Sequence, residues 1–138
     1  MEKKIISLII PFLLSACAFE NFDKRSEREA REFTEKQCPR KVDKFTTLDS
    51  MIYDIESKTL AYHYTLSGDL DNDTIFTPGI WNDFKTILQE ELTNSVELKR
   101  YKEHNVSFSY RYYSEATHKL KYEVTFTADD YQTATPTK

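Results

Sequence analysis

The stretch TTLDSMIYDIESKTLAYHYTLS (residues 46–67) decides the fold, because it holds the clearest strand pattern in the chain. Thr, Tyr and Ile favour strands, and Glu56-Ser57-Lys58 separates two such runs. The pattern predicts a hairpin with strands at about 48–55 and 59–66. In the second strand one face carries Leu60, Tyr62, Tyr64 and Leu66, which is typical of a sheet covered on one side only.

A second hairpin is predicted near the C-terminus, with its loop at residues 114–118. The run NVSFSYRYY places on one face Val106, Phe108, Tyr110 and Tyr112. The run KLKYEVTFT does the same with Leu120, Tyr122, Val124 and Phe126. We expect both faces to pack against helices.

Two helices are predicted, one before each hairpin. The first spans about residues 24–37, where Glu and Arg are spaced for ion pairs, and Pro39 marks its end. The second follows a polar loop at 68–78, and apolar residues recur in it at helical spacing: Ile80, Phe84, Ile87, Leu88 and Leu92, with Trp81 beside them. A shorter helical piece is expected to hold Val96, Leu98 and Tyr101.

The order helix, hairpin, helix, hairpin (αββαββ) predicts a two-layer α+β domain. We expect one four-stranded antiparallel sheet with both helices on one face. Phe33, Phe84, Leu88 and Leu92 would pack there against the sheet aromatics. The 138 residues allow one domain, assigned to residues 24–131, with a loose tail at 132–138.

Composition limits the partners. The formal charge is −4, with basic residues scattered among acidic ones, which makes nucleic acid an unsuitable partner. Nine Tyr and nine Phe indicate a folded core, and two Gly leave no glycine-rich phosphate loop.

The N-terminus MEKKIISLIIPFLLSAC is typical of an export signal, because Lys3 and Lys4 precede an apolar run too short to span a bilayer. Its end, Leu14-Ser15-Ala16-Cys17, resembles the lipobox of bacterial lipoproteins. That resemblance implies cleavage of residues 1–16 and acylation of Cys17, with palmitate among the chains and a tether at 17–23. The protein would be anchored to a bacterial membrane, and in a host with two membranes to the periplasmic face of the outer membrane or to the cell surface.

The folded part also resembles a family of small uncharacterised bacterial envelope proteins. The shared residues are Cys38-Pro39-x-x-Val42-Asp43-x-x-Thr46-x-Leu48-Asp49, Leu60-x-Tyr62-x-Tyr64-Thr65-Leu66, Leu98-Lys99-x-Tyr101, Asn105-Val106-x-x-x-Tyr110-x-Tyr112, Val124-Thr125-x-Thr127 and Tyr131. This chain departs from the family at Arg40-Lys41, where an apolar pair is usual, and in the loop at 114–118, which lacks Gly. The resemblance implies one domain over residues 36–131 and no known activity.

Cys38 has two interpretations. With Cys17 acylated it would be the single thiol of the mature chain, without a CxxC motif. Arg40 and Lys41 could lower its pKa and make it reactive. The alternative, which we favour, is a small buried residue where helix meets sheet.

No metal or cofactor is predicted. Asp69, Asp71 and Asp73 alternate as in a calcium-binding EF loop, but Thr74 and Ile80 replace the required Gly and Glu. The histidines, His63, His104 and His118, show no metal-binding spacing. We therefore expect a solvated acidic loop.

The face of the sheet away from the helices is the candidate binding face. It would carry His63, Ser109, Arg111, Lys121 and Glu123. No nucleophile or oxyanion donors accompany them, so no catalytic residue is assigned and no enzyme activity is expected. The alternative is an ordinary solvated face with an ion pair between Arg111 and Glu123.

The sequence thus predicts a lipid-anchored envelope protein that binds a protein or envelope component through this face or a sheet edge. A second hypothesis is an inhibitor or exclusion-type lipoprotein that blocks an external enzyme, phage or plasmid system. An enzyme using the exposed sheet face is a third.

Overall fold

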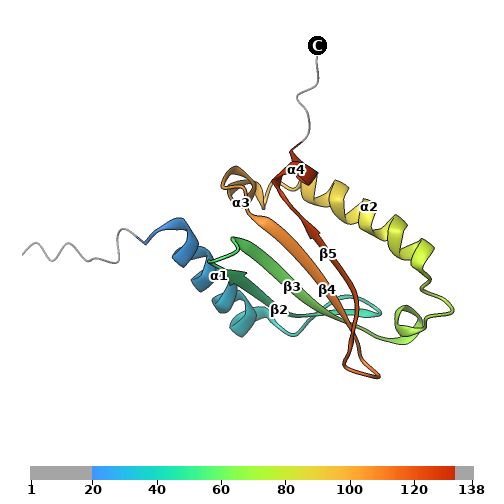
Figure 1. The fold of residues 1–138 in the computed structure, drawn as a ribbon. Coiled ribbons are helices and arrows are strands. Elements are labelled where there is room, and N and C mark those ends of the chain that lie inside the picture. Colours follow the sequence, from blue (N-terminus) through green and yellow to red (C-terminus); the bar gives the residue numbers. More distant parts are fainter. Residues whose placement is uncertain (1–19, 133–138) are drawn as a thin grey trace, which may run out of the picture.

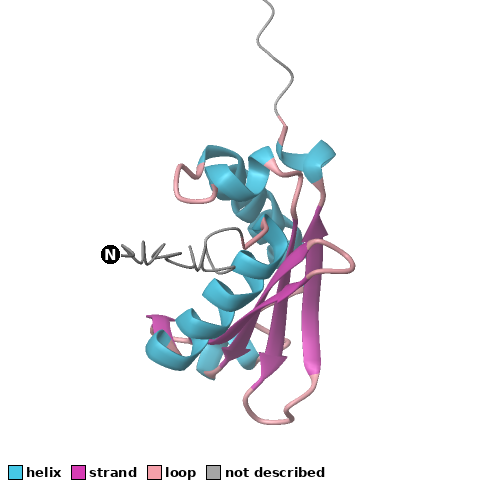
Figure 2. Cartoon of the chain, turned by 90° about the vertical axis from the view of Figure 1, so that its left-hand side faces the viewer, coloured by secondary structure: helices cyan, strands magenta, loops and turns pink. Residues whose placement is uncertain are grey.

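The computed structural model describes residues 20–132. They form an α+β fold in which one twisted sheet carries its helices on one side (Figures 1 and 2). Cys17, the signal at 1–16 and the tail from 133 lie outside the described residues. Among the described residues, none of the helices has the length and apolar character needed to cross a membrane.

The first half of the chain is a helix followed by three strands. α1 (Phe22–Gln37) begins inside the predicted tether, because the side chain of Asn21 accepts a hydrogen bond from the backbone N–H of Lys24. The strands β1 (Arg40–Asp43), β2 (Thr46–Asp54) and β3 (Thr59–Leu66) form an antiparallel meander. The predicted hairpin at 48–55 and 59–66 corresponds to β2 and β3.

The second half begins with the short η2 (Gly68–Asp71) and α2 (Pro78–Asn94), whose N-cap is Thr77. The later elements are α3 (Lys99–Glu103), β4 (Ser107–Ser114), β5 (Leu120–Phe126) and α4 (Ala128–Tyr131). β4 and β5 form the predicted second hairpin. In α4, Tyr131 is buried and donates its hydroxyl hydrogen to the carbonyl oxygen of Val106.

The predicted four-stranded antiparallel sheet is wrong in two respects. The sheet has five strands in the order β1-β2-β3-β4-β5, and β3 and β4 are parallel. The parallel pair follows from length: α2 runs back for about 25 Å, close to the length of an eight-residue strand. It therefore returns the chain to the end where β3 began. The extra strand β1 is fully exposed and carries no apolar alternation that would have revealed it.

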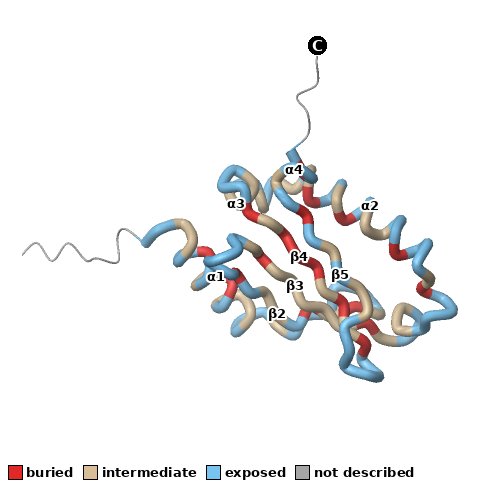
Figure 3. The backbone as a smooth tube through the Cα atoms, viewed as in Figure 1, coloured by how far each residue is buried: buried red, intermediate tan, exposed pale blue. Residues whose placement is uncertain are grey.

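Both helices lie on the same face of the sheet, as predicted, α1 beside β2 and α2 on the side of β5 (Figures 1 and 2). Buried positions recur along β4 and on the sheet-facing side of α2 (Figure 3). α1 contributes Ser26 and Ala30 to the buried set, while the predicted core residue Phe33 is half-buried. Small residues on α1 therefore let the helix approach the sheet closely.

Candidate binding surfaces

The outer face of the sheet brings together four of the five residues predicted for it. His63 on β3 lies opposite Arg111 on β4, and Arg111 lies opposite Glu123 on β5. The Nε of Arg111 is 3.5 Å from Oε1 of Glu123. Ser109 lies two residues before Arg111 on the same strand and is buried.

A hollow of about 440 Å³ occupies this face. Its centre carries small side chains, because Ala61 on β3 pairs with Ser109 on β4. Larger side chains surround them, and the lining residues are Ile52, Asp54, Ser57, Thr59, Ala61, His63, Ser109, Arg111, Glu123 and Thr125. The hollow thus crosses β2, β3, β4 and β5.

Arg111 stands out in this hollow. Its Nε is buried and makes no hydrogen bond among residues 20–132, although it forms an ion pair with the Glu123 carboxylate at 3.5 Å. The neighbouring His63 is half-buried, and its Nδ1 lies 3.4 Å from the hydroxyl of Tyr113. Burial, and then the charge of Arg111, lower the pKa of His63, while Asp49 and Glu123 act in the opposite direction. His63 is therefore neutral at pH 7.

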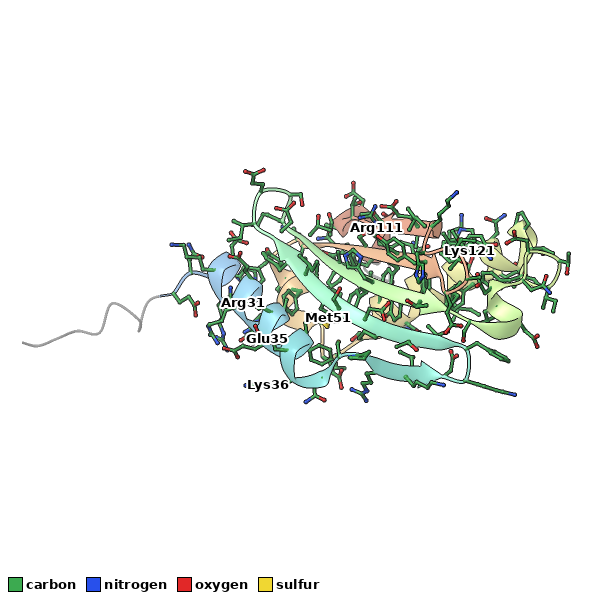
Figure 4. All side chains as sticks on the ribbon, turned by 90° about the horizontal axis from the view of Figure 1, so that it is seen from below. Arg31, Glu35, Lys36, Met51, Arg111 and Lys121 are labelled. Atoms are coloured by element: carbon green, nitrogen blue, oxygen red, sulfur yellow. The ribbon has the colours of Figure 1, made fainter. Side chains whose placement is uncertain are left out.

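Lys121 is not part of this group. Its Nζ lies 2.9 Å from the carbonyl oxygen of Asp71, 3.2 Å from the Asp71 carboxylate and 2.7 Å from that of Asp73. A bulge redirects the side chain, because Tyr112 pairs with Tyr122 but Tyr113 pairs with Leu120. Lys121 and Arg111 accordingly lie apart in Figure 4.

The prediction of a solvated acidic loop at Asp69, Asp71 and Asp73 is therefore wrong for Asp71. The Asp71 carboxylate accepts hydrogen bonds from Ser114 Oγ at 3.0 Å and from the backbone N–H of Ala116 at 3.2 Å. Burial opposes ionisation of Asp71, but the bonds from Ser114, Ala116 and Lys121 outweigh it and lower the pKa of the carboxyl. Asp71 therefore joins the η2 region to the β4–β5 turn.

Four tyrosines form what we term the tyrosine layer on the helix-facing side of β3 and β4. Tyr62 stacks on Tyr110 with ring centroids 5.2 Å apart, and Tyr64 stacks on Tyr112 at 4.8 Å. Tyr110 and Tyr112 are buried, whereas Tyr62 and Tyr64 are half-buried. Burial raises the pKa of all four hydroxyls, that of Tyr64 to about 12.

The hydroxyls of the tyrosine layer differ from those of three other buried or half-buried tyrosines. Tyr53, Tyr122 and Tyr131 donate to an acceptor within the fold. In the part of the chain that the structure describes, the four hydroxyls of the layer have no such partner. They are therefore available to a binding partner.

The sequence correctly predicted that Leu88 and Leu92 of α2 pack in the core, but it wrongly grouped Ile80 and Ile87 with them and placed Trp81 beside the stripe. The buried residues are Trp81, Leu88 and Leu92, while Ile80 and Ile87 are 46% and 50% exposed. Trp81 occupies the sheet-facing side, where its ring stacks on that of Tyr122 at 4.8 Å. Because Trp81 occupies this side of α2, Ile80 and Ile87 lie outside the core.

The exposed isoleucines lie on the side of α2 next to the tyrosine layer. Phe84, between them at helical spacing, contacts Tyr112 with ring centroids 5.7 Å apart. Glu91, one turn after Ile87, acts electrostatically on Tyr64, Tyr110 and Tyr112. We call the stripe of Ile80, Phe84 and Ile87 the α2 stripe. The sequence held one indication of this stripe. The apolar residues of α2 are more numerous than a single face of a helix can bury, so some of them had to be exposed.

A second groove, of about 410 Å³, runs between α1 and the open half of β2. It is lined by Glu27, Arg31, Thr34 and Glu35 and by residues 50–53. Arg31, Glu35 and Met51 appear along it in Figure 4. β1 covers β2 only from Thr46 to Leu48, so α1 takes over the protection of this edge.

Cys38 follows α1 directly and is half-buried, and its thiol is free among residues 20–132. Burial, and then Asp49, raise the pKa of this thiol, and Arg40 offsets them only partly. A raised pKa leaves little thiolate at neutral pH, which favours the packed interpretation over the reactive one. Within residues 20–132, no three His, Cys, Asp or Glu side chains gather closely enough to hold a metal ion.

Known proteins give information on the family and on the fold. A family described as a domain of unknown function (DUF8479) matches residues 21–123. No curated protein matches the chain. Two solved structures share the fold, and in both cases the sequence identity is too low to indicate a common function.

The first is a protein of Pseudomonas aeruginosa provisionally described as secreted, with a TM-score of 0.65 and 14% identity. The match covers 80% of this chain and 92% of that one. The second is the pilotin EpsS of the Vibrio vulnificus type 2 secretion system, with a TM-score of 0.58 and 7% identity. It covers 80% of this chain and 91% of the pilotin.

Proposed function

Since this chain belongs to the DUF8479 family, a domain of unknown function, its role has to be inferred from its own surfaces, and we propose that it is a lipid-anchored envelope protein that binds another envelope protein. Binding takes place on the helix-bearing side of the sheet, at the α2 stripe and the tyrosine layer. No catalysis forms part of this role.

The N-terminal sequence supports the anchor. Cys17 follows Leu14-Ser15-Ala16, and the apolar run before it is too short to serve as a membrane span. Acyl chains on Cys17 would hold the protein at the membrane, because each buried methylene contributes about 0.8 kcal/mol. The fold shared with a secretion-system pilotin and with a protein described as secreted supports an envelope location and a protein partner.

The observation that carries the proposed binding is the exposure of Ile80 and Ile87 on either side of Phe84, which contacts Tyr112 of the tyrosine layer. Covering the exposed half of each isoleucine would contribute about 1 kcal/mol. The unpartnered tyrosine hydroxyls add hydrogen bonds that fix orientation. Apolar side chains flanked by tyrosine hydroxyls match the usual composition of a protein interface core.

Photo-crosslinking in the native membrane tests this proposal. A photo-reactive amino acid is placed at Ile87 in the full-length protein, and at Thr86 as the matched control. Thr86 is adjacent and exposed, but it lies on the side of α2 that lines a different hollow, near Val124. We expect one envelope protein to be crosslinked from position 87 and not from position 86.

The double substitution Ile80→Glu and Ile87→Glu should abolish binding of that same protein, since two charges would have to be buried in the interface. Equal crosslinking from both positions, or binding that survives the double substitution, would contradict the proposal. Capture of an incoming enzyme or phage protein from position 87 would favour the inhibitor hypothesis.

A further inference from the structure

The hollow on the outer face of the sheet has a floor made by two small residues. Ala61 and Ser109 pair across β3 and β4 at its centre. Side chains from the flanking strands, among them Ile52 and Thr125, stand around this floor. A volume of about 440 Å³ exceeds that of an amino-acid-sized molecule and lies within the range of small-ligand sites.

Arg111 gives this hollow a cationic group with unused donors. A guanidinium carries five N–H groups in a fork that matches a carboxylate or phosphate. In residues 20–132 no acceptor pairs with Arg111 by a hydrogen bond, and its buried Nε is left without one. The Arg111 side chain is 37% exposed although its Nε is buried, so a ligand acceptor in the hollow would pair with the other N–H groups of the guanidinium.

The charges around Arg111 restrict which ligand fits. Glu123 lies 3.5 Å from the guanidinium, and Asp54 also lines the hollow. A purely anionic ligand would meet these carboxylates, and a purely cationic one would meet Arg111. A molecule that carries a negative and a positive group side by side fits this pair, because its negative group can face Arg111 while its positive group faces Glu123.

We propose that this hollow binds a small zwitterion of the amino-acid type, with its carboxylate on Arg111 and its ammonium on Glu123. The apolar part of the ligand rests on Ala61 and Ile52. The site lies on the opposite face of the sheet from the α2 stripe, so it is independent of the protein-binding role proposed above.

Glycine is the minimal probe, and acetate and methylammonium are its two halves. The probes are titrated into the purified full-length protein while the backbone amide signals of Ala61, Ser109 and Arg111 are followed by NMR. We expect saturable shifts with glycine and about tenfold weaker binding of either half, because each half loses a charge-assisted bond. Acetate that binds as well as glycine, or glycine without effect, would overturn the proposal.

Variants test the location. Arg111→Gln should remove glycine binding, and Ala61→Met should block it by filling the hollow. Ser107→Met is the matched control, since Ser107 is on the outer face but is not among the lining residues. Circular dichroism checks that each variant is folded, and undiminished binding in folded Ala61→Met would refute the assigned site.

A vesicle experiment separates the free zwitterion from a lipid headgroup of similar chemistry. Phosphatidylethanolamine vesicles are compared with phosphatidylglycerol vesicles in the same NMR measurement. Shifts produced by phosphatidylethanolamine but not by glycine would overturn the proposal in favour of a headgroup site. Shifts produced by glycine at Ala61 and Ser109, with neither vesicle acting there, support it.

Discussion

The hydroxyl oxygen of Thr34 lies 2.9 Å from both the backbone nitrogen and the backbone oxygen of Met51. It accepts the N–H of Met51, and its single proton is shared between the carbonyl oxygens of Met51 and of Ala30, the latter at 3.0 Å. A helix side chain thus takes the place of a strand partner where β1 no longer covers β2.

Thr34→Val should lower the free energy of unfolding by about 1–2 kcal/mol, because the shape is kept while the Met51 groups lose their partner. Denaturation with urea measures the change. Thr86→Val is the matched control, since Thr86 is exposed and its hydroxyl donates to the carbonyl oxygen of Asn82 in its own helix. Equal effects of the two substitutions would show that the contact with β2 contributes nothing.

Lys121→Met should destabilise the fold by about 1–3 kcal/mol, because the Asp71 carboxylate would lose its charged partner in a largely buried place. The side chain of Lys121 is only 13% exposed. Asp73→Asn serves as the control, and we expect little change from it, since Asp73 is 83% exposed. A urea midpoint unchanged by Lys121→Met would contradict this account of the acidic loop.

Stability should fall on mild acidification because of His63. The pKa of His63 is lowered in the folded state from its usual value of 6.5, so below that value the unfolded chain binds more protons. The stabilisation present at neutral pH is therefore lost as the pH falls from 6.5 through the folded-state pKa. The groups facing His63 are Arg111, Asp49, Glu123 and Tyr113.

Urea midpoints at about pH 7.5 and about pH 5.5 test this dependence on His63. His63→Gln should reduce the difference between the two midpoints. The exposed His118 provides the control, and His118→Gln should leave the difference unchanged. An identical pH dependence in His63→Gln and the wild type would rule out His63 as its source.

The two cysteines give a direct test of the proposed anchor. Cys17→Ala should abolish incorporation of labelled palmitate and release the protein from the membrane fraction. Cys38→Ala, which keeps the signal sequence intact, should retain both label and membrane location. Label on the Cys17→Ala protein, or its loss from Cys38→Ala, would show that the lipobox resemblance is misleading.

Period-two alternation in the sequence was enough to predict the β2–β3 and β4–β5 hairpins and the shared outer face of His63, Arg111 and Glu123. It failed at Lys121, because the bulge opposite Tyr112 and Tyr113 breaks the alternation and turns the lysine toward Asp71. Local patterns carry no signal of such an inserted residue.

The contacts between elements far apart in the sequence could not be predicted, for a different reason. The pairing of β3 with β4 depends on the path of α2 across the sheet, which apolar spacing within α2 does not specify. The exposure of Ile80 and Ile87 likewise depends on Trp81 packing against Tyr122, on a strand some forty residues later. β1 was missed because it is a short edge strand with four exposed residues.

The early start of α1 at Phe22 limits how far an anchored molecule can travel from the bilayer. Four residues separate Cys17 from α1, and even a fully extended connection would span only about 18 Å. A lipid on Cys17 would therefore confine the domain to a thin layer over the membrane, where it searches in two dimensions. Partners that reach into this layer would meet it at a high effective concentration, and those held farther away would not meet it at all.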